Sequence, residues 1–559
     1  MRAITNDPIY HAMKRWEDAR DLLSGALAGY LESCLSLNTL LGRDYANARD
    51  IAPGIDSTLE TLHPAMGLQL SQSTSVLSQT RNRLVSSISC LPEEILCQIF
   101  MDVVYAPENT RLSMKKCVRA MYRDLHKLLA VCSVWRNIAI SLGAFWETVP
   151  VIDDPIRSRA IDLSLERSHG ALRLAATTTL DGPPRLIQTV IEHASRFHAL
   201  NLKASFSSQI TSIATHLLRN GALTQLSELF IRCSPPKYSQ PPRISNCIIE
   251  AGSPDQVTFR KLIGSLSVLR LSGIQIHWKT SACFSDRLVE LYVHKVGLGS
   301  SDSSMVTFLS AISSASKLRD LKIINARTYR NPTEDTKLTT LPMVVFPRLQ
   351  SLLLQDLCFN VLEFFLLNIA PGSYHSTLIL SDDVFKVTYS DWTSERISLD
   401  NVTRLLALRK IDTLFLPRGP VDRKPLLEGS GLRRLLESIP KLRELTMHGW
   451  HFYEGFCNGL CPPLVSRLQS CEFSFPRLEL IQLMGIRIRD QEQLKRILVA
   501  LSPQTMVLSG YVRSKDEKWI QLTEGDAVVE WLKANIPSLR LLDPKDDVVA
   551  LRTDSWRLW

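Results

Sequence analysis

Apolar residues return in the pattern L-x-x-L-x-L, or a conservative variant, from residue 169 onward. The clearest copies begin at Leu226, Leu266, Leu288, Leu318, Leu349, Ile411, Leu442 and Leu478, and weaker copies begin at His169, Phe197, His375, Pro503 and Leu539. Alternation of this kind makes a short strand whose leucines face one side. The copies recur irregularly, at a mean period of about 31 residues, so the pattern predicts an array of stacked units.

Apolar segments with helical spacing lie between these strands. We expect helices near residues 185–195, 210–220, 305–314, 361–369, 432–438, 492–501 and 527–535. One strand–helix unit cannot bury its leucines alone, but stacked units can. The pattern therefore predicts an α/β fold over residues 149–559: a leucine-rich-repeat solenoid with a parallel sheet on its concave side. Residues expected to point outward from that sheet are Arg270, Tyr292, Lys322, Glu444 and Gln482.

Residues 1–89 are expected to form a separate helical region. Its apolar positions repeat at spacings of three, four or seven and so make one stripe on a helix: Trp16, Leu23, Leu27, Tyr30, Cys34, Leu37 and Leu41. This stripe could pack on the rest of the chain or, as a short coiled coil, on a second copy, and the short run favours the intramolecular option. Pro53 and Gly54 predict a break near residues 50–58, followed by a weaker helical pattern over 59–89.

Residues 90–148 predict a small unit of short helices. Pro92 stands at a plausible first helical position, and Glu93 and Glu94 follow where the helix dipole favours carboxylates. A second helix is expected over LHKLLAVCSVWRNIAISL, ending near Gly143. So small a unit has more apolar side chains than it can bury, and each one that a partner covers contributes about 1.5 to 3 kcal/mol.

At these residues the chain resembles the F-box family, in particular the fungal F-box-like proteins. The matching phrases are Leu91-Pro92-x-Glu94-Ile95-Leu96 with Ile99-Phe100, then Val131-Cys132-x-x-Trp135-Arg136-x-Ile138-Ala139 and Phe145-Trp146. The resemblance continues through LSLERSHGALRL and EHASRFHALNL toward the repeats and covers about residues 90–205. One departure is the long segment between the two motifs, residues 105–123, which could be a harmless loop or could obstruct the adaptor-binding face.

In that family the F-box binds the Skp-type adaptor of a cullin-RING ubiquitin ligase, and the domain behind it holds the substrate. The resemblance implies that the adaptor interface and its support here are supplied by Leu91, Pro92, Ile95, Leu96, Ile99, Phe100, Val131, Cys132 and Trp135. The target protein is not named by the sequence. The chain would be the substrate-receptor subunit of such a ligase.

The composition excludes several classes of protein. The 559 residues are 45% hydrophobic and 22% charged, too apolar for a disordered chain, and they hold no apolar run long enough to span a membrane. No secretory signal is legible, so we expect a cytoplasmic or nuclear protein that binds neither membrane nor nucleic acid, the net charge of +9 being a small excess.

No catalytic or phosphate-binding motif is present, which predicts a protein that is not an enzyme and needs no cofactor. The twelve cysteines show no CxxC pair. The nearest cluster, Cys457, Cys461 and Cys471 with His448 and His451, is better explained by small buried apolar groups than by a metal site. The Gly429-Ser430-Gly431 run is interpreted as a flexible turn at a helix entry. The aromatic run at residues 450–453 could be an exposed patch or could plug a loop.

Two functional hypotheses remain. In the first, the chain is the ligase receptor described above. In the second, it is an interaction scaffold unrelated to ubiquitin, whose F-box-like helices only cap the open end of the solenoid, because a repeat array exposes its first leucine layer unless something covers it.

Overall fold

A computed structural model describes residues 8–41, 48–85, 88, 91–106, 112–152, 158–178, 184–219, 224–234, 247–250, 252–278, 284–299, 301, 303–330, 343–391, 393–417, 426–461, 475–514 and 516–543. The chain forms two compact units, Met1–Leu96 and Cys97–Trp559. The division falls within one helix. Each unit is described by itself.

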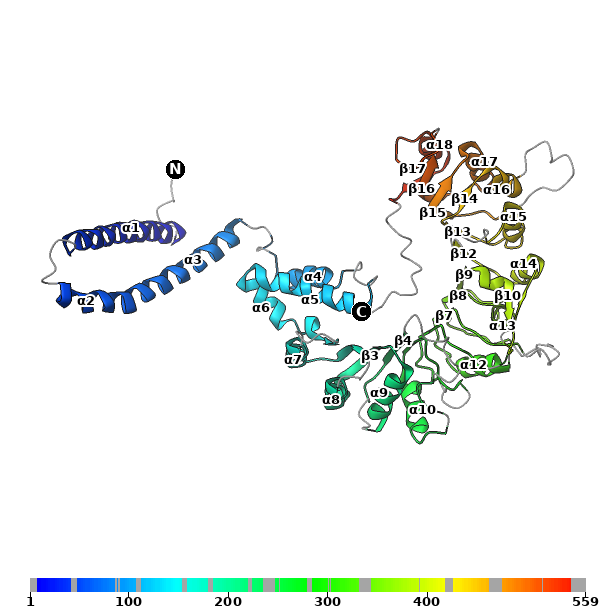
Figure 1. Cartoon of the computed structure of the whole chain (residues 1–559), viewed down its shortest axis with the longest axis horizontal. Coiled ribbons are helices and arrows are strands. Elements are labelled where there is room, and N and C mark those ends of the chain that lie inside the picture. The colour runs from blue at the N-terminus through cyan, green and yellow to red at the C-terminus, as the bar shows by residue number, and fades with distance from the viewer. Residues whose placement is uncertain are drawn as a thin grey trace. The chain divides into compact units, whose positions relative to one another are not determined.

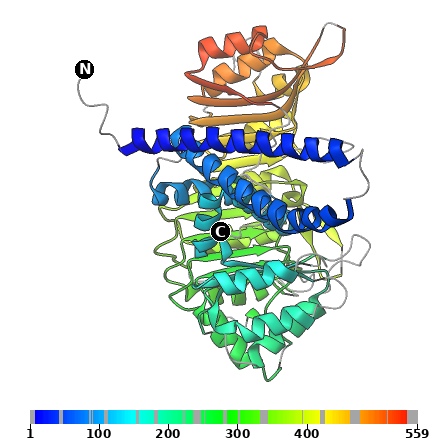
Figure 2. The same ribbon diagram turned by 90° about the vertical axis from the view of Figure 1, so that its left-hand side faces the viewer.

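The first unit consists of long helices (Figures 1 and 2). They are α1 (Pro8–Leu41), α2 (Ala48–Ser57) and α3 (His63–Val85), with a π-helical turn η1 (Thr58–Leu62) between the last two. Among the stripe residues whose burial the structure describes, Trp16, Leu23, Cys34 and Leu37 are exposed, and Leu27 and Tyr30 are half-buried, so the stripe is largely uncovered within this unit.

The predicted helix break at residues 50–58 is wrong. Pro53 lies inside α2, and the helical backbone continues through η1 into α3. In η1 the amide of His63 donates to the carbonyl of Thr58, five residues back, immediately before Pro64. A widened turn of this kind accommodates a proline, which has no amide hydrogen and crowds the preceding turn.

The small helical region contains α4 (Glu93–Val104), α5 (Met114–Val131), α6 (Ser133–Ser141) and the 3-10 turn η4 (Gly143–Trp146). Two predictions need correction here. The single helix expected up to Gly143 is two helices, because Cys132 adopts an extended backbone between them. The part of the 105–123 segment from Met114 onward is helical and contributes buried side chains such as Cys117 and Met121 to the core.

A long sheet follows, and in the described residues it has 16 strands. Its strands are β1 (Thr148–Val151), β2 (Leu172–Thr178), β3 (Phe197–Ala204), β4 (Glu228–Cys233), β5 (Val268–Ser272), β6 (Glu290–His294), β7 (Asp320–Ile324), β8 (Ser351–Gln355), β9 (His375–Ile379), β12 (Thr413–Pro417), β13 (Glu444–His448), β14 (His451–Phe452), β15 (Leu480–Ile488), β16 (Thr505–Arg513), β17 (Trp519–Gln521) and β18 (Ser538–Leu541). The strands pair in the order β1 to β9, β12, β13, β15, β16 and β17, with β14 paired to β15 and β18 paired to β16. All of these pairs are parallel except β16–β17. A separate hairpin joins β10 (Lys386–Thr388) and β11 (Ser394–Arg396).

Helices return the chain between strands. They are α7 (Ser158–Arg167), α8 (Pro184–Glu192), α9 (Ser207–Arg219), α10 (Gln256–Ser265), α12 (Ser303–Ser313), α13 (Phe359–Asn368), α14 (Leu399–Ala407), α15 (Gly429–Glu437), α16 (Glu454–Leu460), α17 (Gln491–Leu501) and α18 (Ala527–Asn535), with short turns η6 (Ala194–Arg196) and η7 (Asp382–Phe385). In Figure 1 the strands line the inner side of the arc and the helices its outer side. The α/β solenoid with a parallel concave sheet is confirmed, and every L-x-x-L-x-L copy coincides with a strand.

The core lies between the sheet and these helices. One leucine layer is Leu269, Leu291 and Leu321, which stand side by side in register on β5, β6 and β7 and are fully buried. Buried leucine side chains each contribute about 1.5 to 3 kcal/mol, and every layer gains this only when the next repeat covers it.

A left-handed backbone residue directly follows several strands and marks the repeat. Gly273, Lys295, Asn325, Asp356 and Gly449 follow β5, β6, β7, β8 and β13, with φ between 48° and 73°. Only glycine adopts this conformation at no cost, although asparagine and aspartate tolerate it comparatively well. The shared turn directs the chain out of the sheet in the same way after each of these strands.

Glycines in the Gly429-Ser430-Gly431 run serve close helix packing, which corrects the flexible-turn interpretation. A Cβ on Gly429 would collide with the carbonyl of Phe456, and one on Gly459 would lie 2.8 Å from the amide nitrogen of Ser430. Helices α15 and α16 therefore approach each other backbone to backbone at this point.

Replacement of Gly429 by alanine should destabilise the solenoid by about 1 to 3 kcal/mol, because the added methyl group forces α15 away from α16. The measurement is the urea midpoint of the full chain by circular dichroism. Gly525→Ala is the matched control, since no atom lies within 4 Å of its added Cβ. Equal midpoints for the two variants would contradict the close approach.

Candidate protein-binding surfaces

The first predicted surface begins at the start of α4. Pro92 directly precedes the helix, and its carbonyl accepts hydrogen bonds from the amides of Ile95 and Leu96. Leu91, Pro92 and Ile95 are exposed, with Ile95 at 48%, whereas Leu96 is buried. Glu93 and Glu94 occupy the first turn, where the positive end of the helix dipole stabilises their negative charges. The exposed side chains of this turn are therefore available to a partner, and Leu96 is not.

The following turns of α4 belong to the second unit and supply support. Phe100 is fully buried, and its ring lies 4.7 Å from that of Trp135, centroid to centroid. Ile99, Cys132 and Trp135 are half-buried. These residues hold α4 against α6, so Phe100 has no surface left to offer.

The corner between α5 and α6 exposes a second apolar group. Cys132 caps α6 through its Sγ, which accepts from the amide of Trp135 at 3.5 Å, and Arg136 Nε donates to the carbonyl of Leu129 at 2.9 Å. These bonds fix the corner and leave Val131 at 57% and Val134 at 43% exposure. Exposed β-branched residues on a fixed corner suit contact with another apolar surface.

The other side of the same helices covers the first strand of the sheet. Tyr122 on α5 donates its hydroxyl to the carbonyl of Thr148 at 3.0 Å and lies 2.6 Å from Ser164 Oγ on α7. Trp146 is buried, donates to the carbonyl of Ala139 at 3.1 Å and lies beneath the Arg167 guanidinium. The helical region therefore caps the solenoid as well as carrying the exposed corner.

A polar and aromatic cluster occupies the concave face of the sheet over β4–β7. The Arg270 guanidinium donates two hydrogen bonds, of 3.0 and 2.9 Å, to the two carboxylate oxygens of Glu290. Lys322 Nζ lies 3.7 Å from the same carboxylate. Phe230 and Tyr292 stand in register on either side of Arg270, and their rings lie 6.3 Å apart, edge to face. The predicted outward direction of Arg270, Tyr292 and Lys322 agrees with their half-buried positions between buried leucines.

One more residue of this face is a buried histidine. The Nδ1 atom of His294 lies 2.8 Å from Ser272 Oγ on the adjacent strand, and the two side chains are almost fully buried. Sequence reasoning missed it, because a single histidine at a strand end carries no spacing signal.

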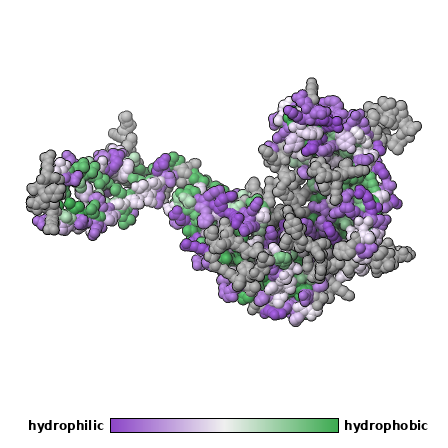
Figure 3. Space-filling view, in the orientation of Figure 1, coloured by the Kyte–Doolittle hydropathy of each residue, from purple (hydrophilic) through white to green (hydrophobic). Residues whose placement is uncertain are grey.

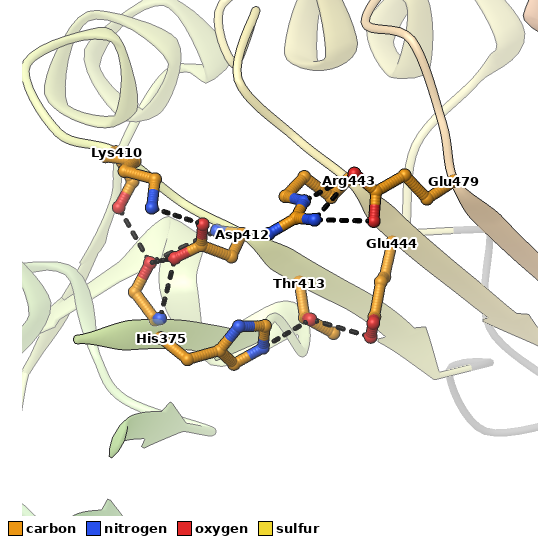
Figure 4. Close-up of polar contacts among 8 residues, drawn as sticks. His375, Lys410, Asp412, Thr413, Arg443, Glu444 and Glu479 are labelled. Atoms are coloured by element: carbon orange, nitrogen blue, oxygen red, sulfur yellow. Dashed lines mark hydrogen bonds and ion pairs between the residues drawn. The ribbon is translucent and has the colours of Figure 1, made fainter. Parts of the chain in front are cut away.

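Further along the sheet, a polar chain crosses the strand starts (Figure 4). Asp412, 1% exposed, accepts from the amide of Ser376 at 2.9 Å and pairs with Lys410 at 2.7 Å. Burial alone would raise the pKa of this carboxyl, but the Lys410 and Ser376 donors outweigh it and lower the pKa. The carboxylate therefore stays charged and fixes the first residues of β9 and β12.

The predicted outward residue Glu444 belongs to the same chain of contacts. Thr413 donates its hydroxyl to Glu444 at 2.9 Å and therefore accepts from Nε2 of His375, also at 2.9 Å. Gln482 is half-buried on β15, as expected of an outward position. Arg443 and Glu479 form an exposed bidentate pair above this chain (Figure 4).

The aromatic run after β13 mainly fills the interior. Trp450 and Phe452 are buried, and Trp450 Nε1 donates to the carbonyl of Leu416 at 2.9 Å. Only Tyr453 is exposed. The loop-plugging alternative is therefore correct for the first two rings, and a three-ring exposed patch is wrong.

The cysteines near this run are packed as small apolar groups. Cys457 and Cys461 are buried, and burial raises the pKa of the Cys457 thiol to about 12. A thiol held protonated in this way is a poor metal ligand. Cys471 lies outside the described residues. Within the ranges that the structure covers, no group of three metal-ligating side chains converges.

No helix in the described part of the chain is both long and apolar enough to cross a lipid bilayer.

No protein-family model and no curated protein matches the sequence. Among solved structures, the chain is similar to a chain from the crystal structure of the Rad7 and Elc1 complex in yeast, with 10% identity and a TM-score of 0.32 over 81% of this chain and 95% of that one. We infer no function from a likeness of this extent.

Replacement of Asp412 by alanine should lower stability by about 1 to 3 kcal/mol at pH 7, because the buried Ser376 amide loses its carboxylate acceptor and Lys410 loses its ion-pair partner. Because the pKa of the Asp412 carboxyl is lower in the folded protein than in the unfolded chain, its ionisation stabilises the fold. This stabilisation is complete above the unfolded-chain pKa of about 3.9 and is lost as the pH falls through the pKa of the folded protein. The difference between wild type and variant should therefore shrink below about pH 4.

Urea midpoints of the full chain at pH 7 and pH 3 provide the measurement. Glu479→Ala is the control, since its ion pair with Arg443 is about half exposed and removal should cost less than about 1 kcal/mol. A gap between Asp412→Ala and wild type that is the same at both pH values would rule out the ionised carboxylate as its source.

Proposed function

We propose that this chain is the substrate-receptor subunit of a cullin-RING ubiquitin ligase of the Skp/cullin/F-box type. One observation carries the proposal: apolar side chains at the predicted adaptor-contact positions, Leu91, Pro92, Ile95 and Val131, are exposed, while Leu96 and Phe100 beside them are buried as support. The same segments carry the two F-box-like phrases. Exposed apolar groups on fixed helices are typical of a surface that a second protein covers.

The second part of the proposal concerns target binding by the sheet. The cluster around Arg270, Glu290 and Tyr292 presents planar charged groups and an aromatic ring, which are enriched where proteins bind one another. We propose that this face holds the target protein. The receptor would perform no bond chemistry and would act by bringing its target close to the catalytic subunits.

A second candidate function is a scaffold unrelated to ubiquitin, with the helices serving only as a cap. The contacts of Tyr122 with Thr148 and Ser164, and the burial of Trp146, favour a capping role. Capping uses residues other than Ile95 and Val131, so the two roles are compatible, and adaptor binding distinguishes the candidates.

Replacement of Ile95 or Val131 by aspartate should abolish retention of a Skp-type adaptor, because a charge would then have to be buried against the adaptor's apolar surface. The measurement is co-purification of adaptor with the full chain at mild salt. At least a tenfold loss is expected, which corresponds to about 1.4 kcal/mol.

The matched control is Val257→Asp on α10, an exposed valine at 66% in the repeat region. Thermal unfolding verifies that all variants remain folded. Phe100 is unsuitable for this test, because a charge at a fully buried position would unfold the helices. If wild type retains no adaptor, or if both aspartate variants retain it fully, the receptor function is refuted and the scaffold remains.

A further inference from the structure

In the part of the first unit that the structure describes, the helices enclose no hydrophobic core. Between Pro8 and Leu96, Leu96 is buried, and every other residue whose burial the structure describes is half-buried or exposed. Figure 3 shows apolar residues spread over the surface of these helices. Helix α1 alone has 34 residues and is about 50 Å long. Helices gain most of their stability from a packed apolar face, so a long helix with an uncovered face indicates a missing partner.

The same surface is depleted of charge. No Asp, Glu, Lys or Arg occurs from Thr61 to Thr80, and Glu32 is the one such residue from Leu22 to Leu41, although 22% of the whole chain is charged. Solvent-facing helices normally carry many charges, and interface cores are depleted of them. Charge depletion therefore points, independently of burial, to a face that another apolar surface covers.

The apolar positions of α1 follow a heptad repeat. Alternating spacings of three and four residues connect Met13, Trp16, Arg20, Leu23, Leu27, Tyr30, Cys34 and Leu37. We refer to these eight residues as the α1 seam. Spacing of this kind is the signature of helices that pair along a seam. Helices α1 and α3 form a hairpin that covers the α1 seam only at its middle. There Leu27 and Tyr30 are half-buried, and Tyr30 Oη lies 3.1 Å from His63 Nε2 on α3.

The composition of the seam favours an antiparallel second copy of the same helix. Antiparallel pairing centred on Gly25 places Met13 level with Leu37, Trp16 with Cys34, Arg20 with Tyr30 and Leu23 with Leu27 of the other copy. The largest seam residue then meets the smallest, and the one charged seam residue meets an aromatic ring, as it already does within α1, where Arg20 lies 5.5 Å from the Trp16 ring. Parallel pairing would instead oppose Arg20 to Arg20 and Trp16 to Trp16.

We propose that the chain self-associates through an antiparallel α1–α1 contact, with the two α1–α3 hairpins forming a shared bundle. The seam and its flanking positions supply sixteen residues per copy: the eight seam residues with Ala12, Glu17, Ala19, Ser24, Ala26, Leu31, Ser33 and Asn38. A standard interface uses about 20 to 30 residues a side, so the contact is a small one and we expect a weak dimer, with a dissociation constant on the order of micromolar. This inference does not depend on the proposed ligase function.

The test is sedimentation velocity of the full chain from about 1 to about 100 µM, the range that a weak interface requires. Wild type should convert from monomer to dimer. Leu23→Glu places a charge in the seam and should raise the dissociation constant at least tenfold. Leu22→Glu is the matched control: its leucine is the neighbour of Leu23, is more exposed at 75% against 47%, and lies off the seam. It should leave the dimer unchanged.

Cysteine cross-linking under mild oxidation tests the orientation. Antiparallel pairing places residue 16 beside Cys34 of the other copy, so Trp16→Cys should form a covalent dimer that is lost on adding Cys34→Ser. Parallel pairing would instead cross-link wild type through Cys34. Monomeric wild type at 100 µM, equal effects of Leu22→Glu and Leu23→Glu, or a wild-type Cys34 cross-link would each overturn the proposal.

Discussion

The solenoid depends on one constraint: a single strand–helix unit cannot bury its own leucines. Each buried layer, such as Leu269, Leu291 and Leu321, is complete only because the next repeat stands in register beside it. Stability therefore accumulates along the stack, and the same constraint makes the ends of the stack critical. At the first end the helices α5, α6 and α7 provide the cover. At the other end, β16 pairs with the short antiparallel strand β17 and with the parallel strand β18.

Capping and docking place opposite demands on the same small helical region. The cap needs buried residues, and Tyr122 and Trp146 supply them toward β1 and α7. A docking surface needs exposed apolar residues on a rigid frame, and the fixed α5–α6 corner with Val131 and Val134 has that character. Because different sides of the helices carry the two tasks, the receptor proposal does not require the cap to open.

The repeats were readable from sequence because a period-two leucine pattern followed by a helical period repeats thirteen times. The left-handed backbone residue that follows several strands could not be predicted from sequence, since Lys295 and Asp356 stand where glycine would be expected. The helix through Pro53 was not predicted, because a proline in a helix interior normally breaks the helix, whereas Pro53 lies inside α2.

Site residues were harder to predict than the fold. Sequence places Leu96 and Ile95 side by side but does not say which one faces the interior, because that depends on how α4 rotates against its neighbours. The buried acceptor Asp412 was equally invisible: its Ser376 partner lies on another strand, brought near only by the parallel register of β9 and β12. Contacts between distant segments carry no local pattern.

The most direct test of the central claim is hydrogen–deuterium exchange of the full chain with and without a Skp-type adaptor. We expect slower amide exchange on adaptor binding in α4 and at the α5–α6 corner, with the amides of β4–β7 unchanged because the proposed target-binding face is a different surface. Slower exchange confined to the sheet, or no change in α4 at saturating adaptor, would contradict it.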